Sequence, residues 1–477
     1  MMYPNIIIII IDALRARNIG CYGYDKPITP NIDKLAKDSL IFDNAFSTIN
    51  TTDPSLTTIL TGRYPSSHGI TAHGVKLKED YIKYLRRSKP KFIQEILNER
   101  NYKTVAIDWL SRWHKIGFNE YLPEDIKKSL IKRFLKKIFN ISPSFLKEFL
   151  QKTAIKKGII KTYSTENFKI SKYLTDQEYT NIAINKIREF KKNITPFFIF
   201  LHYWSVHMPY DPPTNYLEEL QNLKYMETPS MNQILNEING VWKNALEKFT
   251  MDIESSKEML ARYDACIKFV DNEIGRILTT LKDENIFDNT IILVTSDHGE
   301  SLLEHGIYFD HHGLYDETII VPLIVKFPKI AHKRIAPFIQ HIDIVPSILD
   351  YLNFSCNENF DGKSFIPLIE SGKKLRDYIY IEEYNTAKKK AIRTKTNKYI
   401  YSNSEESAIC NYCGKIHGGI EELYDLKTDP GENFNLIKEK PQIAKEFKTL
   451  LKIKISQILE QSKINQTIMD LKNKNRL

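Results

Sequence analysis

The stretch Asn5-Ile-Ile-Ile-Ile-Ile-Ile-Asp12 decides the fold class of this 477-residue chain. Six successive isoleucines predict a strand that is buried on both faces, because a strand with one solvated face would alternate apolar and polar residues. Similar apolar runs occur at 102–107, 196–201, 290–295 and 321–327, and helical patterns lie at 30–39, 54–61, 177–192 and 261–281. This alternation predicts an α/β sandwich with a mostly parallel central sheet.

The composition is that of a folded globular protein, with 42% hydrophobic and 27% charged residues. No apolar run approaches the roughly 18 residues that cross a bilayer. The isoleucine run has neither a basic segment before it nor a cleavage site after it, so we expect no signal peptide and a cytoplasmic location. The five cysteines are an odd and sparse set, which favours a reducing compartment over a disulfide framework.

Acidic and imidazole residues follow three of the buried runs directly. Asp12 ends the first run, the segment 202–207 contains two histidines after the third, and Asp297-His298 follows the fourth. The carboxyl ends of parallel strands line the ligand crevice of an open α/β sheet. We therefore interpret these residues as candidate metal ligands, although each alone would also fit a capping aspartate or a buried histidine with satisfied hydrogen bonds.

Several motifs together resemble the sulfatase family, within the alkaline phosphatase superfamily. They lie at residues 5–15, 20–23, 29–36, 52–56, 60–65, 68–69, 296–300, 311–317, 321–325, 362–364, 391–394 and 423–432. The resemblance covers nearly the whole chain except about 126–172 and the tail after Leu436. It implies an alkaline-phosphatase/sulfatase-like catalytic domain at 1–365 with an insertion at 123–175, a smaller C-terminal α+β subdomain at 366–440, and a helix or tail at 441–477.

The sequence departs from the family at the nucleophile. The sulfatase signature C-x-P-S-R, whose cysteine or serine is oxidised to formylglycine, is here Thr52-Asp-Pro-Ser-Leu56. Threonine carries a methyl group on Cβ and cannot be oxidised to an aldehyde. Unmodified threonine nucleophiles occur in the phosphoethanolamine and phosphoglycerol transferase relatives. Without the resemblance, the simpler interpretation of Thr52 is a helix N-cap before Pro54.

The resemblance implies one metal site and a ring of substrate contacts. Asp12, Thr52, Asp297 and His298 would hold one divalent ion. The imidazole favours manganese or zinc, with calcium and magnesium as open alternatives. Ala13 stands where many sulfatases have a second aspartate.

The remaining site residues are assigned by the same likeness. His207 and His311 would protonate the leaving group or contact the ester, since histidine titrates near neutral pH. The substrate-binding candidates are His73, His312, Arg112 and His114. His202 is expected behind the metal, and His68 is expected to be structural.

Two further features lie outside the sulfatase pattern. Cys410-x-x-Cys413-x-x-x-His417 has part of a zinc-ligand spacing, and no fourth ligand is evident nearby in the sequence. The alternative is a pair of loop thiols.

The second feature is the segment 126–172, which carries twelve lysines and one arginine against two glutamates, a net charge of +11 within a chain of +9. Within it, 126–139 forms a basic amphipathic pattern that would rest on an anionic membrane or gather an acidic glycan or lipid-linked substrate. The alternative is a solvated insertion packed on the body. The charge is local, so we expect no specific binding of nucleic acid.

Together these observations predict a metal-dependent hydrolase or transferase that acts on phosphate esters or phosphodiesters through Thr52. One alternative is a sulfatase that uses the unmodified threonine on a sulfate ester. Another is a non-catalytic binding protein that keeps the fold, although the retained ligand set argues against it.

Overall fold

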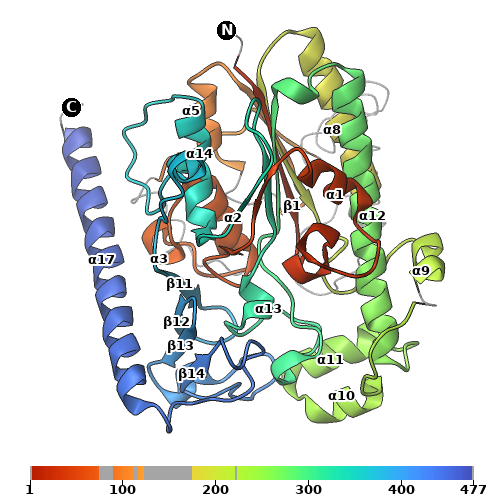
Figure 1. The fold of residues 1–477 in the computed structure, drawn as a ribbon, viewed down its shortest axis with the longest axis vertical. Coiled ribbons are helices and arrows are strands. Elements are labelled where there is room, and N and C mark those ends of the chain that lie inside the picture. Colours follow the sequence, from red (N-terminus) through yellow and green to blue (C-terminus); the bar gives the residue numbers. More distant parts are fainter. Residues whose placement is uncertain (1–2, 75–89, 111–114, 123–174, 221–222, 475–477) are drawn as a thin grey trace, which may run out of the picture.

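The computed structural model describes residues 3–74, 90–110, 115–122, 175–220 and 223–474. A large sheet forms the centre (Figure 1). Its strand order is β5 (Glu120–Leu122), β4 (Lys103–Ile107), β6 (Phe197–Tyr203), β1 (Asn5–Ile11), β7 (Thr290–Thr295), β8 (Leu323–Lys326), β2 (Leu40–Phe42) and β9 (Lys333–Ile335). The strands from β5 to β7 are all parallel, while β8 runs antiparallel to both β7 and β2. The predicted mostly parallel sheet is therefore confirmed.

The isoleucine run lies between two helical layers (Figure 1). Ile7, Ile9 and Ile11 join the core under α1 (Pro30–Ala36), α8 (Asp176–Lys192) and α12 (Ser256–Asp283). The alternate residues Ile6, Ile8 and Ile10 pack against α2 (Thr52–Thr61), α5 (Ile93–Asn98) and α14 (Ile344–Tyr351). Successive side chains of a strand point to opposite faces, so two covered faces require an unbroken apolar run.

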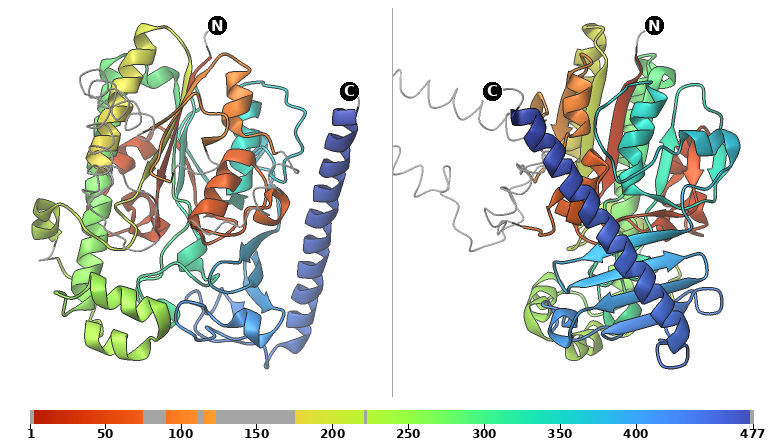
Figure 2. Two further views of the ribbon diagram at one scale, coloured as in Figure 1. Left: turned by 180° about the vertical axis from the view of Figure 1, so that it is seen from behind. Right: turned by 90° about the vertical axis from the view of Figure 1, so that its left-hand side faces the viewer.

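A smaller antiparallel sheet forms the C-terminal part of the molecule. Its strands are β11 (Tyr378–Glu383), β12 (Lys389–Thr394), β13 (Asn397–Ser402) and β14 (Glu421–Asp425), in that order. The long helix α17 (Pro441–Lys474) runs across this sheet and contacts α3 (Pro65–His68) (Figure 2). The predicted C-terminal subdomain is present, and we keep the boundaries at 365 and 440 as a proposal.

The shorter elements connect these layers. They are β3 (Ala45–Phe46), paired with β10 (Ile339–Gln340), and the helices α9 (Thr214–Leu220), α10 (Met231–Glu237), α11 (Gly240–Phe249), α13 (Asp316–Ile319), α15 (Ile366–Ser371) and α16 (Glu405–Ala408). Within the described part of the chain, none of the helices combines the length and the apolarity that crossing a bilayer requires. The predicted basic segment 126–139 lies outside the described residues.

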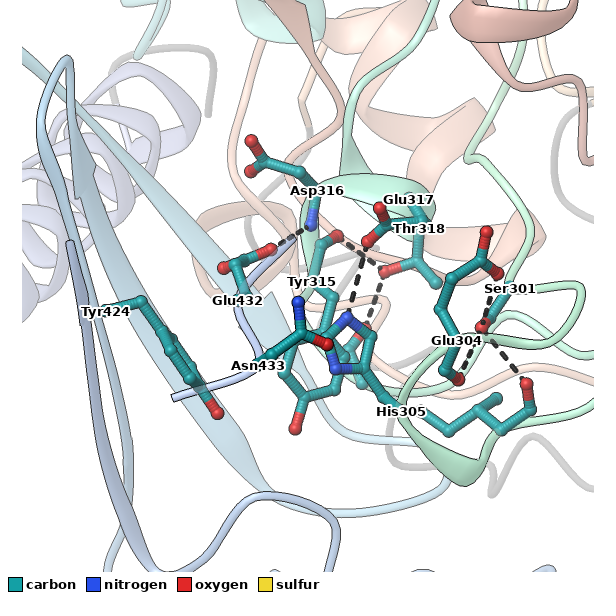
Figure 3. A network of polar contacts seen from close by, with 12 residues as sticks. Ser301, Glu304, His305, Tyr315, Asp316, Glu317, Thr318, Tyr424, Glu432 and Asn433 are labelled. Carbon is teal, nitrogen blue, oxygen red and sulfur yellow. Dashed lines mark hydrogen bonds and ion pairs between the residues drawn. The ribbon is translucent and has the colours of Figure 1, made fainter. Parts of the chain in front are cut away.

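Buried ion pairs join the small sheet to the layers around the large sheet. Asp316, in α13, meets Arg393 Nη2 at 2.9 Å and Lys398 Nζ at 2.6 Å, and both of these partners lie in the small sheet. Lys398 Nζ also lies 2.6 Å from Glu432 Oε1. In Figure 3, the Glu432 carboxylate accepts a hydrogen bond of 2.7 Å from the backbone N–H of Asp316. The two parts of the molecule are thus connected by charges that are shielded from water.

Candidate active site

The candidate site lies along the carboxyl ends of four neighbouring strands. Asp108 follows β4, His202 lies in β6, Asp12 follows β1, and Asp297 with His298 follows β7. Because β4, β6, β1 and β7 are adjacent and parallel, residues at their ends form one row. All five side chains are buried.

Asp12, Asp297 and His298 converge closely enough to hold one cation. A carboxylate oxygen from each aspartate and one ring nitrogen of His298 all lie within 4.8 Å of one another. Within the described residues, three carboxylate oxygens of these aspartates have no hydrogen-bond partner: both oxygens of Asp12 and Oδ2 of Asp297. Buried carboxylate oxygens without partners cost free energy, and a divalent cation would satisfy them. The donor set therefore fits a metal ion.

His298 is oriented as a ligand. Its Nδ1 lies 2.8 Å from the carbonyl oxygen of Gly299, which can only accept, so Nδ1 carries the hydrogen. Nε2 is left with a lone pair and lies 3.3 Å from Asp297 Oδ2 and 3.7 Å from Asp12 Oδ1. Burial lowers the pKa of His298 to about 4, which keeps the imidazole in its neutral, metal-binding form.

The two aspartates have opposite electrostatic surroundings. Burial, and next the charge of Asp12, raise the pKa of Asp297 to about 7. The neighbouring histidines, His207 foremost, lower the pKa of Asp12 against the effect of burial. Two carboxylates this close repel each other, and a cation between them would relieve that repulsion.

Thr52 presents its hydroxyl to this group. Thr52 is the first residue of α2 and is buried, and its Oγ1 lies 3.3 Å from His298 Nε2. The N-cap residue is Thr51, and no side-chain capping bond is made there, so Thr52 does not act as a helix cap. The nearby Ser55 hydroxyl donates to the carbonyl of Asp297 at 2.6 Å. Thr52 is therefore the better placed hydroxyl for attack on a bound ester.

His207 and His311 flank the group. The ring centroids of His311 and His298 are 4.1 Å apart, and those of His207 and His311 are 5.6 Å apart. The Nδ1 atom of His311 lies 2.6 Å from the carbonyl oxygen of Asn50, and that of His207 lies 2.7 Å from the carbonyl oxygen of Met208. Each carbonyl oxygen accepts a hydrogen bond from Nδ1, which leaves both Nε2 atoms for a ligand or a proton.

The other predicted residues have separate surroundings. His73 Nδ1 lies 3.1 Å from Asp53 Oδ2, in the residue that follows Thr52. His312 joins a second cluster with two cysteines and His417. Arg112 and His114 lie outside the described residues.

His202 and His68, for which we expect supporting roles, lie beside residues of the site and of α2. His202 contacts Asp12 from behind, with its Nε2 at 3.6 Å from Oδ2. His68 is buried, with its Nε2 3.2 Å from Thr58 Oγ1.

Sequence reasoning missed three buried residues that position the site. Asp108 Oδ1 lies 2.9 Å from His202 Nδ1. Asp310 Oδ1 accepts the backbone N–H of His311 at 2.7 Å. His341 Nδ1 lies 3.3 Å from Ser55 Oγ. Asp108 follows an apolar strand as Asp12 does, so the same signal would have found it. Asp310 lies in a loop, and His341 begins a short 3-10 helix after the two-residue strand β10, so neither follows an apolar run of useful length.

Two family models match the chain. The model described as "Sulfatase" matches residues 4–354, and the model described as "N-sulphoglucosamine sulphohydrolase, C-terminal" matches residues 303–461. Among curated proteins, the N-acetylglucosamine-6-O-sulfatase of Bacteroides thetaiotaomicron is 25% identical over an alignment 528 positions long, which covers 94% of this chain and 85% of the relative.

Solved structures share the fold. One, described as a complex with its substrate D-glucosamine-2-N,6-O-disulfate, has a TM-score of 0.67 at 21% identity and covers 96% of this chain and 98% of its own. The phosphonate monoester hydrolase of Agrobacterium radiobacter has a TM-score of 0.64 at 20% identity, with 96% of each chain covered. This architecture thus occurs in proteins that act on more than one class of ester.

Proposed function

The chain belongs to the sulfatase family of ester hydrolases, and from this premise we propose a metal-dependent hydrolase or transferase of phosphate esters and phosphodiesters that uses Thr52 as nucleophile. One observation carries the proposal. The Thr52 hydroxyl lies 3.3 Å from His298 Nε2, beside carboxylate oxygens that lack hydrogen-bond partners in the described structure. A hydroxyl next to a cation-binding group is the arrangement that nucleophilic catalysis needs.

Asp12, Asp297 and His298, together with Thr52, would hold the cation. The mixed set of oxygens and one imidazole nitrogen favours manganese or zinc over calcium, which prefers oxygen ligands. A bound divalent cation supplies positive charge that lowers the pKa of a neighbouring hydroxyl and stabilises the charge on reacting oxygens.

The proposed reaction has two displacement steps. In the first, Thr52 loses its hydroxyl proton to solvent, and its Oγ1 forms a bond to phosphorus as the bond to the ester oxygen breaks. The departing oxygen takes a proton from His207, which enters this step as an imidazolium. Burial lowers the pKa of His311 to about 3, so the neutral His311 contacts the ester instead. In the second step, water attacks phosphorus of the threonine phosphate and the His207 imidazole accepts a proton from that water. The bond between phosphorus and Oγ1 breaks, and Thr52 Oγ1 regains its proton from solvent. With an acceptor alcohol in place of water, the outcome is a transfer.

The threonine is the reason for preferring phosphorus to sulfur. A formylglycine hydrate can expel sulfate by elimination, but a threonine sulfate cannot, because Cβ carries a methyl group. Its release would need water to attack at sulfur, which is slow. Attack at phosphorus is the ordinary second step of phosphatase chemistry.

A sulfatase that uses unmodified Thr52 is the second candidate, and the relatives favour it. The chain is similar to an N-acetylglucosamine-6-O-sulfatase and to a structure bound to a glucosamine disulfate. Under this alternative the substrate would be a sulfated glycan.

A substrate panel tests the two candidates. Aryl sulfate, phosphate monoester, phosphodiester and phosphonate substrates would each be assayed with manganese, zinc, calcium and magnesium, alongside the Asp297→Ala variant. We expect turnover of a phosphorus ester that depends on manganese or zinc and is lost in Asp297→Ala. Turnover of the sulfate alone would favour the second candidate, and no turnover of any substrate would favour a binding protein.

A further inference from the structure

A second cluster of ligand-type side chains lies beside the candidate active site. It contains His312, Cys410 and Cys413, which are buried, and His417, which is partly buried, and one ligand atom from each lies within 4.8 Å of all the others. Three of them come from the segment between α16 and β14, and His312 comes from the loop before α13. We propose that these four residues bind one structural zinc ion. The proposal does not rest on the proposed function, because none of the four belongs to the group around Asp12.

The four ligand atoms lie close enough together for one tetrahedral site. Zinc bonds of about 2.0 Å to nitrogen and 2.3 Å to sulfur place tetrahedral ligands about 3.3–3.8 Å from one another. Cys413 Sγ and His417 Nε2 are 3.1 Å apart, close to this range. Two thiolates and two imidazoles in a closed tetrahedron are a typical structural zinc set.

Both histidines are oriented by oxygen atoms on the far side of the ring. His312 Nδ1 lies 3.0 Å from Asp310 Oδ2, and His417 Nδ1 lies 3.2 Å from the carbonyl oxygen of His305. The carbonyl oxygen of His305 accepts a hydrogen bond from Nδ1 of His417, while the Asp310 carboxylate faces Nδ1 of His312 at ion-pair distance, so Nε2 of each ring is left for a ligand. Metal-bound histidines are held in this way by a carboxylate or a backbone carbonyl. This arrangement is an independent sign that both rings serve as ligands.

The two cysteines lie on a tight turn. The backbone N–H of Gly414 donates to the carbonyl of Cys410, and the N–H of Cys410 donates to the carbonyl of Lys415, both at 2.8 Å. Gly414 has a φ of +73°, which a residue with a side chain rarely adopts. Both thiols are free. The turn therefore holds two sulfur ligands on the same side without a disulfide.

The zinc would connect the C-terminal subdomain to the active-site loop. His312 directly follows His311, whose ring stacks on that of His298. A zinc bond to His312 would hold this loop against the segment 410–417. In this role His312 is a positioning residue for His311, not a substrate contact.

Metal analysis of the full chain tests the proposal. The Asp297→Ala background removes a ligand of the other site, so zinc bound there does not confuse the count. After dialysis against a weak chelator, we expect about one zinc per chain in this background. The added pair Cys410→Ser and Cys413→Ser should lose it, while Cys356→Ser, at a half-buried thiol elsewhere, should retain it. Zinc that persists without both cysteines overturns the proposal.

A second measurement needs no cysteine variant and covers the case in which that variant does not fold. In the Asp297→Ala chain, an organomercurial should release the zinc in step with the modification of the Cys410 and Cys413 thiols. Replacement of the zinc by cobalt(II) should give the visible spectrum of tetrahedral cobalt with thiolate charge-transfer bands. The site would be refuted if the purified chain contained no zinc and Cys410 and Cys413 reacted freely or formed a disulfide. An octahedral cobalt spectrum would refute it as well.

Discussion

At the scale of single residues, the hydrogen bond made by one ring nitrogen decides what the other nitrogen can do. The backbone carbonyls near His207, His298 and His311 each lie 2.6–2.8 Å from Nδ1. All three imidazoles therefore present Nε2 to the same space. The sequence indicates which histidines follow strands, but the tautomer depends on carbonyls that the fold brings to them.

The first prediction concerns Thr52. Thr52→Ala should lower kcat by at least about a thousandfold, because no other hydroxyl takes the place of the nucleophile. Metal binding should remain largely intact, since Asp12, Asp297 and His298 are unchanged. Mass spectrometry of quenched wild-type enzyme should find a phosphoryl group on the peptide that contains Thr52.

Thr52→Ser is the matched control because it keeps the hydroxyl and removes only the methyl group. It should retain much of the activity. Covalent modification at Ser55, or normal turnover by Thr52→Ala, would contradict the assignment of the nucleophile.

The second prediction concerns His207, which is less buried than His311 and stacks on Trp204 with ring centroids 4.3 Å apart. If His207 protonates the leaving group, His207→Ala should cost about 10²–10⁴-fold in kcat with an alkyl ester. The loss should be small with 4-nitrophenyl esters, whose leaving group needs no proton. Kinetics over a series of leaving groups measure this difference, and an equal loss across the series would assign His207 to substrate binding instead.

At the scale of elements, the parallel strands bring together residues that are far apart in the chain. Asp108, His202 and Asp12 stand at the ends of β4, β6 and β1. Nδ1 of His202 lies 2.9 Å from Asp108 Oδ1, and its Nε2 lies 3.6 Å from Asp12 Oδ2. The two carboxylates raise the pKa of His202 well above its ordinary value, against the effect of burial. His202 thus lies between two carboxylates and faces Asp12 with its Nε2.

This row gives the third prediction. Asp108→Asn should weaken the binding of manganese or zinc by about 10–100-fold. The substitution removes the charge that holds His202, which in turn faces the ligand Asp12, while Asp12 itself is unchanged. Isothermal titration calorimetry, with the metal ion added to the metal-free enzyme, gives the affinity. Asp288→Asn is the control, since Asp288 is exposed at the opposite end of the same sheet, and it should leave the affinity unchanged. An unchanged affinity in Asp108→Asn would remove Asp108 from the site.

At the scale of the whole molecule, the small sheet is attached to the layers around the large sheet by buried charges. Asp316 receives both Arg393 and Lys398, and Lys398 also meets Glu432. Burial acts against ionisation, but Lys398 and Arg393 lower the pKa of Asp316 below its usual 3.8. The stabilisation from the Asp316 carboxylate is therefore fully present above about pH 4 and is lost as the pH falls below that value.

The fourth prediction follows from this interface. Arg393→Ala should lower the free energy of unfolding by about 3–5 kcal/mol at pH 7, because it leaves a buried carboxylate with less compensation. The difference between variant and wild type should shrink as the pH falls below about 4. Urea unfolding at several pH values measures both effects.

Arg334→Ala provides the control for this prediction. Arg334 pairs with Asp43 at an exposed position, and such pairs contribute about 0–1 kcal/mol. A similar loss in both variants would mean that burial of the Asp316 pairs has no special effect on stability.

The sequence by itself determined the sheet and brought together most of the candidate metal group. A short, unbroken run of β-branched residues is typical of a strand covered on both faces, and the carboxyl ends of parallel strands meet, so Asp12, Asp297 and His298 could be brought together without coordinates. Thr52 followed from the resemblance to the sulfatases, and no periodicity in the sequence would have identified it.

Only the tertiary structure decided which partner each loop residue has. His312 was expected beside His311 in the active site, yet neighbours in an extended loop point in different directions, and its ring joins Cys410, Cys413 and His417. The fourth ligand was not evident in the sequence because it lies on a distant segment. Contacts between loops depend on how the small sheet packs against the large one, and that packing leaves no pattern in either loop.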